Sequence, residues 1–140
     1  MLKTILVAVD SSELSQRVIQ TLNELKIQPA TKIILTHVLP SPELDTELVA
    51  DRPHTSEELL YRHVEKQLQS YQADLPCDSD LEIVTGDPAV EIVRLAHIHQ
   101  VDLIVIGNRG LTGLKRILEG SVSSQVVADA PCSVLVIKPE

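Results

Sequence analysis

The chain has 140 residues, a length typical of one domain, and 44% of them are hydrophobic, so it can form a substantial core. Its net charge of −8 at pH 7 argues against a face that neutralises nucleic-acid phosphates. With two tyrosines and no Trp or Phe, it also has almost no aromatic surface on which bases could stack. Nucleic acid is therefore not an expected partner.

The first apolar run spans only the five residues from Ile5 to Val9 and is closed by Asp10. It is too short for the core of a signal peptide or for a membrane span, so no membrane partner is expected. Cys77 and Cys132 lack the spacing of a metal site. We interpret both as reduced thiols of a cytoplasmic protein.

Short runs rich in Val, Ile and Leu alternate along the chain with segments of helical periodicity. Strands are predicted at residues 4–10, 32–39, 80–86, 102–107 and 132–138. Helices are predicted at residues 11–26, 56–75, 86–100 and 121–129. This alternation predicts an α/β fold with a parallel sheet and right-handed crossovers, in which residues 1–140 form a single domain.

Apolar residues three and four apart mark the face that each helix is expected to turn toward the core. In the first helix these are Leu14, Val18, Ile19, Leu22 and Leu25. In the second they are Leu59, Leu60, Val64 and Leu68, and in the third Val90, Ile92, Val93 and Leu95.

Polar and proline residues mark the helix ends. Ser11 or Ser12 is expected to cap the first helix, and Asp87 the third, with Pro88 in its first turn. Pro131 should separate the last helix from the last strand.

The histidines give little sign of a metal site. His97 and His99 would lie on nearly opposite sides of one helix, so they are expected to be solvated and not to share an ion. His37, in the second strand, is expected to be buried with its hydrogen bonds satisfied.

Four of the five glycines lie between residues 107 and 120, directly after the fourth predicted strand. Arg109, Lys115 and Arg116 fall in the same segment, and Ser121 follows at the start of the last predicted helix. A helix N-terminus offers free N–H groups and a partial positive charge, and glycine lets an anion approach closely. The segment therefore predicts a phosphate site, although it fits neither the P-loop nor the dinucleotide fingerprint.

The spacing that this segment does show is G-x2-G-x9-G-S, from Gly107 through Gly110 and Gly120 to Ser121. Together with "KTILVAVDSSELS", "THVLP", "GDPAVEIVRLA", "DLIVIGNRG" and "APCSVLVIKP", it makes the whole chain resemble the universal stress protein family, in particular its ATP-binding branch. The resemblance implies a doubly wound, Rossmann-like sheet of five parallel strands in the order 3-2-1-4-5, with helices on both faces.

The resemblance also implies a nucleotide site. Asp10 would lie near the ribose and adenine, Ala8 would line the adenine pocket, and the backbone of Val38 would recognise the adenine edge. The residues expected around the phosphates and ribose are Gly107, Asn108, Arg109, Gly110, Gly120, Ser121 and Val122.

The function expected from this resemblance is that of a regulatory protein of the stress response that binds ATP or AMP. The alternative is a slow ATP hydrolase, with Asp10 helping to hold a metal ion such as Mg²⁺. The residues leave open whether the protein is an enzyme. The family also implies a homodimer formed through the last strand, Ser133 to Lys138, which would cover an apolar sheet edge.

Overall fold

A single sheet organises the computed structural model, which describes residues 2–10, 14–39, 54–107 and 122–138. The strands are β1 (Thr4–Ala8), β2 (Lys32–Leu39), β3 (Ser79–Thr85), β4 (Leu103–Gly107) and β5 (Ser133–Ile137). All paired strands are parallel, and their order is β3-β2-β1-β4-β5. The predicted sheet is confirmed, and β1 and β4 lie side by side where its winding reverses.

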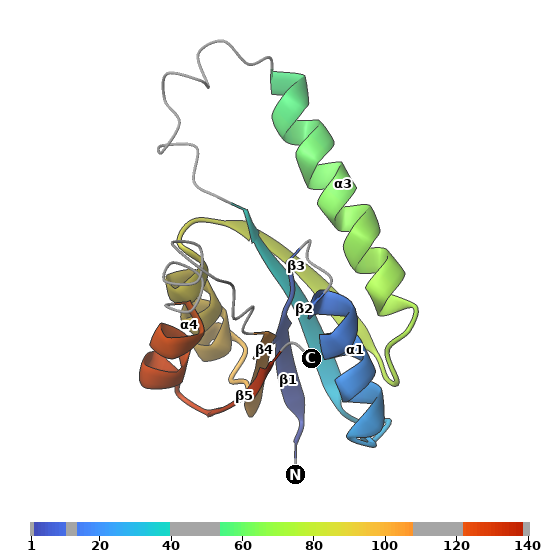
Figure 1. The fold of residues 1–140 in the computed structure, drawn as a ribbon, viewed down its shortest axis with the longest axis vertical. Helices are drawn as coiled ribbons and strands as arrows, with labels where there is room; N and C mark the ends of the chain where they lie inside the picture. Colours follow the sequence, from blue (N-terminus) through green and yellow to red (C-terminus); the bar gives the residue numbers. More distant parts are fainter. Residues whose placement is uncertain (1, 11–13, 40–53, 108–121, 139–140) are drawn as a thin grey trace.

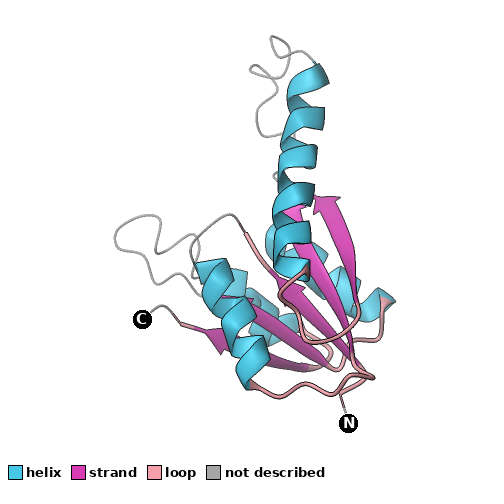
Figure 2. Ribbon diagram, turned by 90° about the vertical axis from the view of Figure 1, so that its right-hand side faces the viewer, coloured by secondary structure: helices cyan, strands magenta, loops and turns pink. Residues whose placement is uncertain are grey.

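Four helices among the described residues cover the two faces of the sheet (Figure 1, Figure 2). On one face lie α1 (Leu14–Glu24) and α3 (His54–Gln72). On the other lie α4 (Pro88–Ile98) and the helix over residues 122–129. The expected arrangement of helices on both faces is therefore confirmed.

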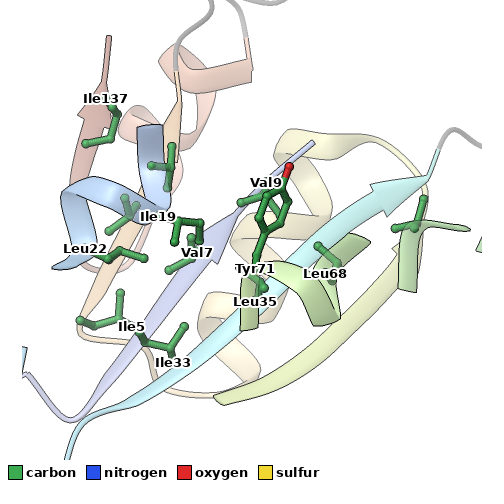
Figure 3. Packing of buried hydrophobic residues seen from close by; sticks show 13 residues of the cluster. Ile5, Val7, Val9, Ile19, Leu22, Ile33, Leu35, Leu68, Tyr71 and Ile137 are labelled. Carbon is green, nitrogen blue, oxygen red and sulfur yellow. The ribbon is translucent and has the colours of Figure 1, made fainter. Parts of the chain in front are cut away.

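Alternating strand residues build two separate cores. Ile5 and Val7 of β1 point toward α1 and α3 (Figure 3), whereas Leu6 points toward α4. The three side chains are fully buried. Complete burial of such a side chain contributes about 1.5–3 kcal/mol, so a central strand that is apolar on both faces stabilises the fold from both sides.

The helix faces agree with the sequence only in part. Val18, Ile19, Leu22, Val64, Leu68, Ile92 and Leu95 are buried as predicted, and Val93 is half-buried. Leu59 and Leu60 are exposed, which corrects the prediction, because the N-terminal half of α3 projects past the strands (Figure 1). Leu25 is exposed because it follows the end of α1, and Val90 because the buried face of α4 runs through Ala89 and Ile92.

The predicted ends of the later elements are confirmed where the structure describes them. The Asp87 carboxylate accepts the Val90 N–H at 3.1 Å as the N-cap of α4, and Pro88 is the first residue of that helix. The last helix ends before Pro131, and β5 begins two residues after it. Ser11 and Ser12, the predicted caps of α1, lie outside the described residues.

A carboxylate before β4 fastens the start of β1. Oδ2 of Asp102 accepts the backbone N–H groups of Lys3 at 2.8 Å and Thr4 at 3.0 Å. These two hydrogen bonds hold the pKa of Asp102 below its ordinary value, because they stabilise the charged carboxylate. The bond from Thr4 has the larger effect on the pKa. A carboxyl group whose pKa is lower in the folded than in the unfolded protein stabilises the fold when the pH is above the unfolded-state pKa. This stabilisation is lost as the pH falls through the folded-state pKa.

Asp102→Asn should therefore be less stable than the wild type at neutral pH, and the difference should shrink as the solution is acidified. Urea unfolding of both proteins across the acidic range measures this. Asp129→Asn, at an exposed position of the last helix, is the control. A difference that stays constant down to strongly acidic pH would contradict the role given to the charge.

Candidate functional site

The turn from β1 into α1 is held by Ser15, whose side chain is 2% exposed. The Asp10 N–H donates to Ser15 Oγ at 3.0 Å, and the Ser15 hydroxyl lies 2.7 Å from the Asp10 carbonyl oxygen and 3.2 Å from its Oδ1. One hydroxyl thus engages the main chain and the carboxylate of the same residue. These contacts hold Asp10 against the first turn of α1.

The end of β2 is tied to the same turn. The Val9 N–H donates to the Thr36 carbonyl at 2.9 Å, and His37 Nδ1 lies 2.9 Å from the Val9 carbonyl oxygen. Because a carbonyl oxygen only accepts, Nδ1 of His37 donates in this contact. His37 therefore has the expected partner, but it is half-buried and not buried.

At the end of β4, Gly107 lies directly under α1. A Cβ built on Gly107 would lie 2.7 Å from Leu14 Cδ2 and 2.9 Å from Leu14 Cγ, closer than real side chains approach one another. Glycine here lets the first turn of α1 pack onto the strand. This packing role was not predicted, because the sequence suggested only a ligand role for Gly107.

A cavity of about 350 Å³ opens at this carboxyl edge of the sheet. Its lining includes five of the predicted nucleotide-site residues: Ala8, Asp10, Val38, Gly107 and Val122. The other five, Asn108, Arg109, Gly110, Gly120 and Ser121, lie outside the described residues. The structure therefore brings together every predicted site residue that it describes.

Other residues of the cavity wall were not predicted. Thr36 and Ile106 flank Ala8 in the sheet register, and Pro88 and Ile92 come from α4. Strand alternation could have revealed the first two, because Thr36 shares a face with Val38 and Ile106 lies beside Ala8. The contributions from α4 depend on how that helix crosses the sheet, and no local pattern gives this.

The wall is mostly apolar, with a few polar groups. Asp10, Ser15, Thr36 and His37 are the polar or ionisable side chains among its described residues, and Asp10 is the only carboxylate. An apolar cavity with a few placed polar groups is typical of a small-molecule site. Such a cavity at the reversal point of an open α/β sheet is where ligands of this architecture bind.

No group of three or more His, Cys, Asp and Glu side chains in the described part of the chain is arranged to hold a metal ion. His97 is exposed, whereas His99 Nε2 lies 3.2 Å from Glu82 Oε1 on β3.

None of the described helices combines the length and apolarity needed to cross a membrane. Cys77 and Cys132 are free, and burial raises the pKa of both thiols.

The fold is a doubly wound α/β arrangement with a cavity at the switch point of its sheet. The chain belongs to the universal stress protein family, because the family model matches residues 1–138. One relative is the universal stress protein Sll1388 of Synechocystis sp., which is 29% identical over 150 residues and covers 96% of each chain.

Solved structures share the fold over nearly the full length. The protein MJ0577, whose structure served for an assignment of biochemical function, is 30% identical, with a TM-score of 0.83 over 100% of this chain and 98% of that one. A universal stress protein family protein of Arabidopsis thaliana, At3g01520, was solved with AMP bound. It is 23% identical, with a TM-score of 0.68 over 99% of this chain and 92% of that one.

Proposed function

We propose that this chain, folded as a single domain, binds an adenine nucleotide, ATP or AMP, in the cavity at the carboxyl edge of its sheet. The observation that carries the proposal is that Ala8, Asp10, Val38, Gly107 and Val122 line one cavity. These residues come from four separate elements, and the family resemblance had assigned all of them to a nucleotide. Membership of the family supports a regulatory role in a stress response, in the cytoplasm.

Nucleotides in relatives support the same conclusion. The Arabidopsis thaliana relative holds AMP, and another universal stress protein of the same fold, 23% identical to this chain, was solved in complex with cAMP. In the proposed pose the adenine lies against Ala8 and Val38, and the ribose lies near Asp10. The phosphates face the segment from Gly107 to Val122, whose glycine-rich sequence predicts an anion site.

The described cavity lining fits nucleotide binding without rapid hydrolysis better than it fits catalysis of ATP hydrolysis. A single carboxylate, Asp10, together with phosphate oxygens is a donor set that Mg²⁺ accepts, so a metal ion could accompany ATP. Hydrolysis also needs a residue that positions the attacking water. Among the described lining residues His37 is the only other ionisable side chain, and its Nδ1 is bonded to Val9.

The deciding experiment begins with mass spectrometry of any nucleotide released when freshly purified protein is denatured. Calorimetric titration of nucleotide-free protein with ATP, AMP and GTP follows, and ATP with Mg²⁺ is monitored for phosphate release. We expect an adenine nucleotide to bind more tightly than GTP, without turnover. Turnover above that of a variant that cannot bind would favour the hydrolase, and failure of every adenine nucleotide to bind would refute the proposal.

We also propose that the chain forms a homodimer through β5, with Ser133 to Lys138 pairing across the interface. β5 lies at the edge of the sheet, and its apolar residues are largely half-buried. An unpaired apolar edge strand favours association with a second chain. An apolar groove of about 470 Å³, lined in part by Leu25, Val134 and Leu135, lies beside the same strand.

Sedimentation equilibrium should therefore give twice the mass of one chain, and the mass should fall toward that of the monomer on dilution. The nucleotide titration can be repeated at protein concentrations on both sides of that transition. A monomer at every concentration would contradict the dimer and leave the nucleotide site unaffected.

A further inference from the structure

The peptide unit that joins Val9 to Asp10 lies just beyond the paired part of β1. The registers of β1 with β2 and with β4 both end at Ala8, and the Val9 N–H makes one further bond, to the Thr36 carbonyl oxygen at 2.9 Å. Val9 is 6% exposed, so its carbonyl oxygen needs a partner within the protein. The partners of this peptide unit decide how Asp10 enters the cavity wall.

Side chains from two elements bind the two polar groups of this peptide unit. β2 extends past the last residue that it pairs with β1, which places His37 beside the unit, and His37 Nδ1 donates to the Val9 carbonyl oxygen at 2.9 Å. From α1, Ser15 Oγ accepts the Asp10 N–H at 3.0 Å. Because a peptide unit is planar, bonds to its C=O and to its N–H together fix its orientation.

The orientation of this peptide unit is passed on to the Asp10 carboxylate through Ser15. The serine hydroxyl lies 2.7 Å from the Asp10 carbonyl oxygen and 3.2 Å from Asp10 Oδ1. Rotation of the peptide unit would move the Asp10 N–H away from Ser15 and would disturb the other contacts of the same hydroxyl. Ser15 is 2% exposed, so it has little room to follow such a movement.

We propose that His37 is a positioning residue for the nucleotide site: by holding the Val9 carbonyl, it fixes the Val9–Asp10 peptide unit and thereby the Asp10 carboxylate that faces the nucleotide. The inference rests on the proposed function, since it needs a nucleotide beside Asp10. Asp10, Ser15 and His37 all line the cavity. A direct contact of the imidazole with the nucleotide is therefore the competing explanation, and two variants of His37 separate it from positioning.

The matched pair for the test is His37→Asn and His37→Leu, which introduce side chains of similar branched shape. Asparagine Nδ2 is attached to Cγ, as Nδ1 is in histidine, so it can donate to the Val9 carbonyl, whereas leucine cannot. Because one hydrogen bond is lost, His37→Leu should weaken AMP or ATP binding by about threefold to tenfold in calorimetry, and His37→Asn should retain most of the affinity. His63→Leu, at an exposed position of α3, is the control and should leave the affinity unchanged. Equal losses in the asparagine and leucine variants would show that the imidazole itself is required and would overturn the proposal.

A double-mutant cycle separates positioning of Asp10 from a general loss of structure. Asp10→Ala removes the carboxylate that His37 is proposed to hold in place, so His37→Leu should cause no further loss of affinity in that background. An equal loss in both backgrounds would overturn the proposal. So would an unchanged affinity of folded His37→Leu, even if its melting temperature were lower.

A spectroscopic readout tests the contact in the wild type, without nucleotide. At alkaline pH, where a histidine ring is neutral, nitrogen NMR should show the His37 proton on Nδ1, the nitrogen that bonds the Val9 carbonyl. A proton on Nε2 instead would leave Nδ1 unable to donate and would overturn the proposal, even where the leucine variant fails to fold. If the wild type binds no adenine nucleotide, the proposed function and the positioning role both fail, whereas a proton on Nδ1 would still establish the contact.

Discussion

Replacing Gly107 by alanine should destabilise the fold by about 1–3 kcal/mol, the usual cost of forcing an extra group into a packed interior. The new Cβ would lie 2.7 Å from Leu14 Cδ2 and 2.9 Å from Leu14 Cγ. To relieve this clash, Leu14 must change rotamer or the first turn of α1 must move away from β4. Urea unfolding of the wild type and of Gly107→Ala measures the difference in the free energy of unfolding. The dependence of this free energy on urea concentration is taken to be the same for both proteins.

Leu14→Ala provides the control, because it removes the side chain that the new methyl group meets. In that background Gly107→Ala should cost clearly less, which gives a favourable coupling between the two changes. Strict additivity would refute the packing role. A normal stability with weakened nucleotide binding would show instead that Gly107 is required only by the ligand.

Much of the fold could be predicted because strands and helices leave different local periodicities. The apolar run at residues 32–39 coincides with β2, and the order of the sheet follows the family pattern. Periodicity alone does not reveal how far a helix extends beyond its sheet. Leu59 and Leu60 therefore look like core residues in the sequence, although Leu59 is 65% exposed in the structure.

The lining of the cavity could be predicted where it is built from strand ends. Ala8, Asp10 and Val38 are placed by the strands that lead to them, and a parallel sheet gathers those ends at one edge. The close approach of Leu14 to Gly107 could not be predicted in this way. It depends on where α1 crosses the sheet, which is set by packing between residues distant in the sequence.

Gly120→Asp should reduce adenine-nucleotide affinity by at least about a hundredfold. Gly120 lies outside the described residues, so the prediction rests on the sequence spacing and on Val122, two residues later, which lines the cavity. Two like charges 4 Å apart repel by about 4 kcal/mol at an effective dielectric constant of about 20, equivalent to roughly a thousandfold in affinity. Partial screening by solvent lowers this figure, and calorimetry with ATP measures the loss.

Gly120→Asn is the matched control, because it adds a side chain of nearly the same size without the charge. If phosphate lies beside residue 120, the aspartate variant must bind ATP more weakly than the asparagine variant, and added salt must narrow the gap. Adenosine, which has no phosphate, should bind the two variants equally. Equal ATP affinities of the two variants would show that the phosphates do not bind beside residue 120. The anion site would then have to be sought elsewhere along the cavity.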